Sequence, residues 1–532
     1  MSIRRRALLG GTLALPGAAR AQAPRLPPPT PAQQTAPAGT GGVPLDDRVA
    51  QGFRRDVLIR WGDRVMPGAP AWDPRRPDPE AAAHQFGWDA RITGLLVPPQ
   101  AADRVRRAIL AVAHPTLEPA LALPAGQASF ELAGAMQGAS ILNLEYQGAG
   151  RAGRWVVVEG GFQSRRLTVA TLCRISGPMA GEASLRSTEN PDGDSVRGLI
   201  APQGGCITPW RTALFAEGDP DEQAPWAARR LAERGTRNHY GWVVEVDLSD
   251  PTTLPVKRTA PGRRAHGDVA AARSADGRAV LYMTEARPGG FLYRFVSAAR
   301  IATGEGADNT ALLDAGTLYV ARRAGDRGLW AKLADTNAAR LDPRTAAQEL
   351  GATPLDLPSG LAVGPDGRLF AALRGDPLGG PERTGGRVVE LAPNGGDAAA
   401  DGFGYAVLYA VPPALRIAGS DVVFAAPDSV DADDQARLWV GTAQGALQAQ
   451  SGGADGLFVV AAGAAPRRVY GAPRGAAIGG AALPPGGDGT VFAAVRRPGM
   501  ERGASFAAPI TRWPAFDPAL PPRSTLIALT PG

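Results

Sequence analysis

Hydrophobic positions along the chain form short runs, and turn residues separate one run from the next. In several places a polar or glycine turn leads directly into a run of β-branched, aromatic and other apolar residues. The clearest cases are residues 153–158, 276–282, 366–371, 437–441 and 488–493. Three of these begin with Asp-Gly, which between apolar runs is a strong hairpin signal. Over the second half of the chain such units recur at intervals of roughly 50–90 residues, which favours a β-propeller over two β-sandwiches.

Helical patterning is sparse. Residues 223–232 predict one short helix, with Pro225 near its first turn, and residues 345–350 predict another. The 532 residues include 68 glycines and 49 prolines, a composition that favours turns over long helices. We therefore expect an all-β fold, a propeller with long insertions and few short helices.

The first 23 residues resemble a removable export signal. Three arginines at positions 4–6 precede an apolar run to residue 19, and residues 21–23 (Ala-Gln-Ala) offer a cleavage site. Adjacent arginines before the apolar run favour the twin-arginine route over the general secretory route. Residues 24–44 form a proline-rich tether, so the folded domain is expected over residues 45–532. The predicted location is the periplasm or another exported compartment.

Charge and hydropathy argue against two kinds of partner. The formal net charge is +6, but four arginines and no acid lie in the first 23 residues, which leaves 53 basic against 51 acidic residues. Such a balance does not suggest a nucleic-acid partner. No run reaches about 18 apolar residues, so we expect no membrane span.

A series of short motifs then carries a family resemblance. In chain order they are D-V-L-I-R-W-G-D at 56–63, Q-F-G-W at 85–88, S-R-R-L-T at 164–168, S-G-P-M-A-G at 176–181, T-P-W at 208–210, Y-G-W-V-V-E-V-D at 240–247, F-A-A-P-D at 424–428 and R-W-P at 512–514. Together they resemble the PhoX-type alkaline phosphatases, and the likeness covers nearly all of residues 50–530. The resemblance implies twin-arginine export and a six-bladed propeller. It also implies phosphomonoester hydrolysis at a central iron and calcium cluster, held by a cysteine thiolate and several carboxylates. Oxygen ligands suit calcium, and the metals offset charge on phosphoryl oxygens.

The departures from the family pattern fall on the positions of its metal ligands. Gln203 stands where the family has its cysteine, and Cys206 follows three places later. Of the family's T-C-E-E segment only Glu217 is kept, and its G-D-D segment here reads Thr-Glu-Ala with Glu285. In K-H-E-G-A the glutamate is lost, and Asp268 lies one place further on.

Two histidines keep family positions, and one arginine replaces a histidine. His114 lies in the segment that matches N-H-E-Y-T, where the acid is missing, and His266 precedes Asp268. Each histidine is either a metal or acid–base group or a structural polar residue, and the structural interpretation is favoured. Arg497 occupies the histidine position of the family's Q-H-P-G and adds charge near the expected channel.

The candidate metal ligands each have an ordinary structural alternative, such as a solvated acid or a turn cap. They are Glu217, Asp428, Glu285, Asp268 and Cys206. They allow for a calcium ion, whereas Gln203 at the cysteine position argues against iron. The two cysteines, Cys173 and Cys206, form a disulfide or remain buried thiols.

The candidate anion-binding residues are Arg165, Arg166 and Arg497. The adjacent pair, Arg165 and Arg166, either binds a phosphate or braces a sheet edge.

The sequence therefore predicts a PhoX-like phosphatase-family protein with a degraded iron and calcium site and weak or no phosphomonoesterase activity. The alternatives are an active metal-dependent phosphomonoesterase with an altered site, a periplasmic propeller that binds an anion or a partner, and a calcium-using hydrolase of the lactonase type. The expected ligand is a small anion or a phosphomonoester. These hypotheses differ in whether four acids lie close enough together to bind one metal ion. The acids are Glu217, Asp268, Glu285 and Asp428.

Overall fold

The fold was analysed in a computed structural model that describes residues 43–148, 150–375, 385–411, 424–445, 448–461, 465–484 and 488–532. The predicted export signal and all but the end of the predicted tether lie outside these residues. The described chain is mostly β-strand, and its α-helices are short, the longest being α5 (Pro225–Glu233) with 9 residues.

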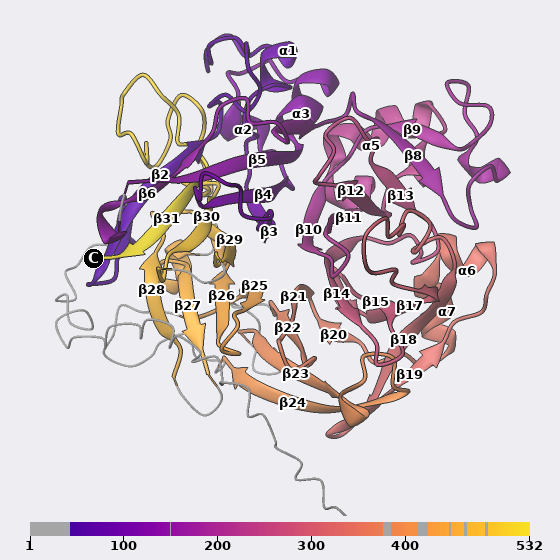
Figure 1. Cartoon of the computed structure of the whole chain (residues 1–532). Helices are drawn as coiled ribbons and strands as arrows, with labels where there is room; N and C mark the ends of the chain where they lie inside the picture. The colour runs from indigo at the N-terminus through magenta and orange to yellow at the C-terminus, as the bar shows by residue number, and fades with distance from the viewer. Residues whose placement is uncertain are drawn as a thin grey trace, which may run out of the picture.

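The strands form six blades around a central axis (Figure 1). Blade 1 consists of β3 (Arg91–Leu96), β4 (Arg107–His114), β5 (Gly138–Gln147) and β6 (Arg154–Val157), with β7 (Arg165–Leu167) also paired to β5. Blade 2 consists of β10 (Pro202–Ile207), β11 (Thr212–Glu217), β12 (Val243–Asp247), β13 (Val256–Arg258), β8 (Leu172–Ser176) and β9 (Ser195–Arg197). Blade 3 consists of β14 (His266–Arg273), β15 (Arg278–Glu285), β17 (Leu292–Arg300), β18 (Gly316–Ala324) and β19 (Arg327–Lys332).

The second half of the chain builds the other three blades. Blade 4 consists of β21 (Pro358–Val363), β22 (Leu369–Leu373), β23 (Arg387–Pro393) and β24 (Gly402–Ala410), and its outer strand pairs with that of blade 3. Blade 5 consists of β25 (Pro427–Ala432), β26 (Leu438–Thr442), β27 (Gly456–Val460), β28 (Arg467–Gly471) and β1 (Arg48–Val49). Blade 6 consists of β29 (Ala477–Ala482), β30 (Val491–Arg496), β31 (Thr525–Pro531) and β2 (Phe53–Arg60). A small separate sheet pairs β16 (Pro288–Gly290) with β20 (Leu355–Asp356).

The first and last blades close the ring in two ways. Strand β2, near the start of the domain, pairs with β31, the last strand, so blade 6 combines an early and a late segment of the chain. The inner strands β3, β10, β14, β21, β25 and β29 each contact the next around the axis, and β29 contacts β3. The predicted six-bladed propeller is therefore confirmed.

Burial between blades explains why these strands hold the ring together. Strand β4 reads R-A-I-L-A-V-A-H and is buried on both faces. Successive side chains point to opposite faces of a strand. Accordingly, Leu110 and Val112 join a cluster with blade 6, whereas Ile109 and Ala111 join one with blade 2. Each pair of neighbouring blades shares one such apolar cluster.

The turn and helix signals of the sequence agree with this architecture. The Asp-Gly turns at 276, 366 and 488 each connect the inner strand of a blade to its second strand. The helix predicted at 223–232 is present as α5, and that predicted at 345–350 as α7 (Pro343–Glu349). The remaining helices are α1 (Pro79–Ala82), α2 (Pro119–Ala122), α3 (Phe130–Met136), α4 (Pro220–Gln223), α6 (Asn337–Leu341) and α8 (Gln448–Ser451).

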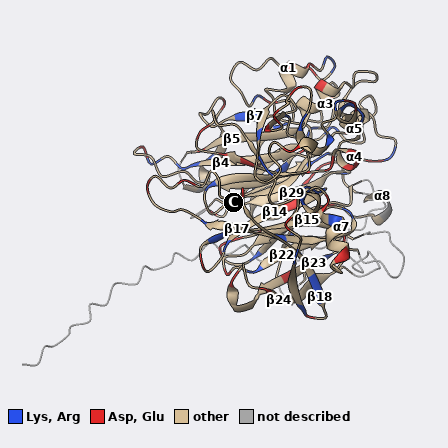
Figure 2. Cartoon of the chain, turned by 90° about the vertical axis from the view of Figure 1, so that its right-hand side faces the viewer, with Lys and Arg blue, Asp and Glu red and all other residues tan. Residues whose placement is uncertain are grey.

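Figure 2 shows basic and acidic residues interspersed over the described chain. No described helix is long and apolar enough to cross a membrane.

Candidate functional site

Five of the predicted site residues lie at one end of the propeller, here called the channel mouth. It is the end where the six inner strands begin and their hairpin partners β4, β11, β15, β22, β26 and β30 end. Glu217 and Glu285 are the last residues of β11 and β15, and Asp268 and Asp428 lie at the starts of β14 and β25. Arg497 directly follows β30.

Glu217 is fully buried and has a complete set of partners. Its Oε1 lies 2.7 Å from Lys257 Nζ and accepts the Ile200 amide at 3.0 Å. Its Oε2 accepts the Gly241 amide at 3.2 Å. The Lys257 ammonium also lies over the Tyr240 ring, 4.1 Å from its centroid. The carboxylate therefore serves a buried ion pair inside blade 2.

Glu285 is also buried, and it faces two arginines. Its Oε2 lies 2.8 Å from Arg344 Nη1, and its Oε1 lies 3.4 Å from Arg287 Nε. Its cationic partners are different from those of Glu217, so these two glutamates do not share a site.

Asp268 and Asp428 are joined by an arginine that the sequence analysis did not single out. Arg91 Nη2 lies 3.1 Å from Asp268 Oδ2, and its Nη1 lies 3.5 Å from Asp428 Oδ2. Burial raises the pKa of Asp268 to about 6. Burial also opposes ionisation of Asp428, but the charges of Arg91 and three further arginines lower its pKa.

A second missed pair completes this group. Asp89 has no exposed surface, and Arg496 approaches it with Nε at 2.9 Å and Nη2 at 2.7 Å. Arg496 Nη1 also lies 3.2 Å from Asp428 Oδ2. We call Asp89, Arg91, Asp268, Asp428 and Arg496 the channel cluster. One sequence signal could have indicated Asp89 and Arg91: these two charged residues flank Ala90 at the start of an apolar strand.

The two histidines are buried and neutral. His114 Nδ1 contacts the Asp89 carbonyl oxygen, and Nε2 lies 2.7 Å from Ser140 Oγ. His266 Nδ1 lies 2.8 Å from the Glu217 carbonyl oxygen, and its Nε2 has no hydrogen-bond partner. Burial holds the pKa of each well below its usual value, and neighbouring arginines lower it further. Of these two histidines, only His266 has a ring nitrogen without a hydrogen-bond partner among the described residues.

The predicted anion-binding pair lies in sheet contacts. Arg166 donates to the carbonyl oxygens of Ala139, Ala135 and Gln137 at 2.7, 2.7 and 2.8 Å. Arg165 donates to three further carbonyls, at positions 247, 251 and 253. Both guanidinium groups brace backbone, although through carbonyl oxygens and not through carboxylates.

Both cysteines are free thiols, so the disulfide alternative is not formed. Burial raises the pKa of the Cys173 thiol to about 12 and that of Cys206 further still. Cys206 packs against the apolar cluster between blades 2 and 3. Gln203, at the family's cysteine position, donates to the Ala201 carbonyl at 3.0 Å.

These donors do not fit an iron and calcium cluster. Among the described residues, no group of three His, Cys, Asp or Glu side chains is placed to hold a metal ion. The four acids that would have to lie close together to bind one metal ion divide between three sets of cationic partners, and each has a cation beside it. They are Glu217, Glu285, Asp268 and Asp428. A side chain at Gly204 would collide with the Asp268 carboxylate, so the inner strands leave little space there.

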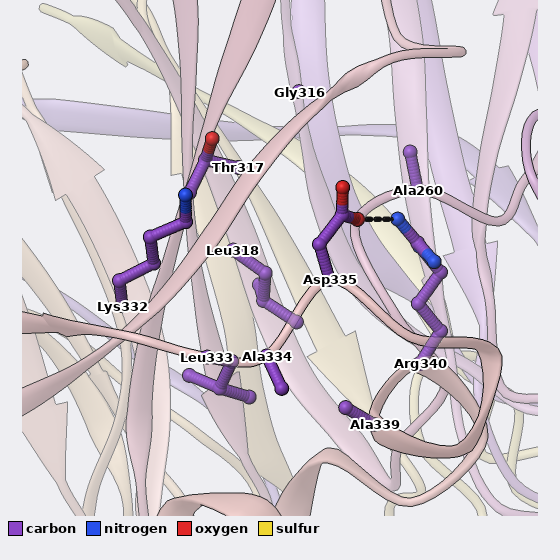
Figure 3. A pocket seen from close by; sticks show the side chains of 10 residues that line it. All are labelled: Ala260, Gly316, Thr317, Leu318, Lys332, Leu333, Ala334, Asp335, Ala339 and Arg340. Atoms are coloured by element: carbon purple, nitrogen blue, oxygen red, sulfur yellow. Dashed lines mark hydrogen bonds and ion pairs between the residues drawn. The ribbon is translucent and has the colours of Figure 1, made fainter.

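The described chain also contains cavities away from the channel cluster, and their volumes range from about 10 to about 590 Å³. Figure 3 shows one of about 10 Å³, lined by outer parts of blade 3 and closed by the Asp335–Arg340 ion pair. A water molecule needs about 10–15 Å³, so this cavity is too small for a substrate.

Comparisons with known proteins agree with the fold. The family model of alkaline phosphatase PhoX matches residues 43–499. The solved structure of Pseudomonas fluorescens PhoX in complex with vanadate, a transition state analogue, is 26% identical with a TM-score of 0.82, and the match covers 94% of this chain and 97% of that one. A gluconolactonase from Xanthomonas campestris is 13% identical over 93% of this chain and 99% of its own, with a TM-score of only 0.32. The comparison with curated proteins gave no match.

Proposed function

Since the chain belongs to the PhoX alkaline phosphatase family, we propose that it is an exported PhoX-like propeller whose metal site is degraded, with weak or no phosphomonoesterase activity. One observation carries this proposal. The buried acids at the channel mouth are paired with guanidinium or ammonium groups, where a metal centre would need them as ligands. Hydrolysis of a phosphomonoester in this family depends on metals, so a site without them would lose most of its rate.

The energetics of these pairs support the proposal. Arg91 and Arg496 are both nearly fully buried, and each bridges two acids of the channel cluster. A metal ion that took over these carboxylates would leave two buried guanidinium groups without partners. Breaking one buried ion pair costs about 3–5 kcal/mol, so metal binding would have to offset that cost at each pair.

The localisation proposal rests on the sequence and on the family. The arginines at 4–6 and the Ala-Gln-Ala at 21–23 favour a signal peptide over residues 1–23 and the twin-arginine route. A proline-rich tether over 24–44 would then precede a single propeller domain over 45–532.

An active phosphomonoesterase with an altered metal site is the second candidate. The observation that favours it is the likeness to Pseudomonas fluorescens PhoX, which was solved with the transition state analogue vanadate. The metal would be calcium, because oxygen donors outnumber thiolates at the channel mouth and both cysteine thiols have raised pKa values. His266 Nε2 is the ring nitrogen free to join such a site.

Elemental analysis combined with a phosphatase assay separates these candidates. The exported, purified protein is analysed for iron and calcium by mass spectrometry and assayed with a chromogenic phosphomonoester at alkaline pH. Pseudomonas fluorescens PhoX is treated identically as the active reference. We expect iron and calcium far below one atom per chain and turnover far below that of the reference. Near-stoichiometric metal together with comparable turnover would refute the proposal.

A further inference from the structure

Among the described residues, the carboxylate nearest to Arg497 is one that already pairs more closely with another arginine. The Arg497 side chain is 17% exposed, and its Nε is buried without a hydrogen-bond partner. The nearest carboxylate oxygen is Asp89 Oδ2 at 3.9 Å, which Arg496 already engages at 2.7 Å. The guanidinium group is thus mostly desolvated and still partly accessible.

The surroundings of Arg497 carry an excess of positive charge. Arg496 directly precedes it, and Arg374 occupies the equivalent place after the second strand of blade 4. Burial lowers the pKa of Arg497 to about 10, and the charges of Arg496 and Arg374 contribute to the shift. Asp89 and Asp428 are the carboxylates that act on it, and both are shared with other arginines. With the whole channel cluster counted, the guanidinium groups of Arg91, Arg374, Arg496 and Arg497 face the carboxylates of Asp89, Asp268 and Asp428, and burial raises the pKa of the adjacent Asp431 to about 7.

The backbone at Arg497 is held in a conformation that non-glycine residues rarely adopt. Its φ is +46°, in the left-handed region, and Pro498 follows it. Its amide donates to Ser524 Oγ at 3.0 Å, which helps to fix this conformation. Left-handed residues are strained and tend to occur at functional sites, where the surrounding fold maintains them.

We propose that Arg497, together with Arg374 and Arg496, forms a metal-independent binding site for a small tetrahedral oxyanion such as inorganic phosphate. Guanidinium groups present planar forks of N–H donors that match the oxygens of phosphate, and a buried anion would balance the excess positive charge. The inference rests on the proposed function, because a metal cluster at the channel mouth would itself supply the charge that binds phosphate.

The test is calorimetric titration of the purified full-length mature protein with inorganic phosphate, in the presence of a chelator. A parallel titration uses a non-hydrolysable phosphonate analogue of a phosphomonoester, which distinguishes the free anion from an esterified one. Arg497→Gln and Arg374→Gln are compared with Arg229→Gln, a matched control at an exposed residue of α5. The melting temperature of each variant without phosphate checks that it is folded.

We expect phosphate binding that survives chelation and weakens by about tenfold to a hundredfold in Arg497→Gln, since hydrogen bonds between charged groups contribute about 1.5–3 kcal/mol. Arg374→Gln should weaken it less, and Arg229→Gln should not change it. Two results would overturn the inference: no phosphate binding by the folded wild type, or unchanged affinity in folded Arg497→Gln. Binding that vanishes with chelation, accompanied by phosphomonoester turnover before chelation, would refute the proposed function as well.

Discussion

Replacing Lys257 by methionine tests whether Glu217 is a structural partner or an available metal ligand. Methionine keeps most of the apolar stem but removes the ammonium group that lies 2.7 Å from Glu217 Oε1. Both side chains have no exposed surface, so solvent cannot replace the lost partner. Removing one member of a buried pair costs about 3–5 kcal/mol, because it leaves an uncompensated buried charge.

The assay is urea unfolding at pH 8 and pH 5, followed by tryptophan fluorescence in metal-free buffer. Unfolding entropy is about 2.1 cal/mol/K per residue. In a thermal melt, the same loss of about 4 kcal/mol would therefore lower the melting temperature of a domain of this size by about 4 °C. The loss should be smaller at pH 5, since protonation of Glu217 removes its charge. A loss below about 1 kcal/mol at pH 8 would refute the assignment of Glu217 to a structural pair.

Two further variants make the measurement specific. Lys332→Met is the matched control, because Lys332 is the other lysine of the chain and is exposed at the end of β19. It should change stability by less than about 0.5 kcal/mol. The double variant Lys257→Met with Glu217→Gln should recover part of the loss, because it removes both charges.

Three shorter predictions concern other parts of the fold. The pKa of Asp268 is raised to about 6 from 3.8, so this group binds a proton on folding between those values. The contribution of this protonation to the unfolding free energy is full below the pKa of Asp268 in the unfolded state. It is lost as the pH rises through the pKa of Asp268 in the folded state. Relative to Asp268→Asn, the wild type should therefore lose about 3 kcal/mol of unfolding free energy between pH 4 and 7. The measurement is urea unfolding of both proteins across this pH range, and the same pH dependence of the unfolding free energy in both would contradict the prediction. Ile59→Ala in β2 should lower the unfolding free energy by about 2–5 kcal/mol, because Ile59 is buried between blades 6 and 1. Val57 in the same strand is exposed, so Val57→Ala should lower it by less than about 1 kcal/mol. Equal losses in urea unfolding would argue against the closure of the ring. A thiol reagent should label both Cys173 and Cys206 in urea without reductant and neither rapidly in the folded protein; absence of labelling in urea would indicate a disulfide.

The architecture could be predicted because its signals are local. An Asp-Gly turn between two apolar runs specifies a hairpin wherever it occurs, and the hairpin at 276–277 joins β14 to β15 as expected. The short helix predicted at 223–232 begins at Pro225, where the missing amide hydrogen is tolerated. The family motifs then supplied the number of blades, which local signals alone do not give.

The candidate site could be predicted only in part, because its partners are distant in the sequence. The family motifs marked Glu217 and Asp428 as candidate metal ligands, but they could not show which cations face them. Arg91 and Asp428 are separated by 337 positions, and Arg496 and Asp89 by 407. Such pairs depend on closure of the ring, since they join residues of different blades. Arg166 was a candidate for phosphate binding, and only the folded chain shows that three carbonyl oxygens use its guanidinium group.

The channel cluster explains how a propeller of this family could keep its fold without a metal centre. Buried carboxylates that gather at one end of a channel repel one another unless a cation lies between them. A metal ion can supply that charge, and so can an arginine that is part of the chain. Arg91 and Arg496 join Asp89, Asp268 and Asp428 in this way. The six apolar clusters between the blades contain none of these residues. A change of chemistry at the channel mouth is therefore compatible with an unchanged scaffold, and Arg497, whose nearest carboxylate pairs more closely with Arg496, is where the new chemistry should be sought.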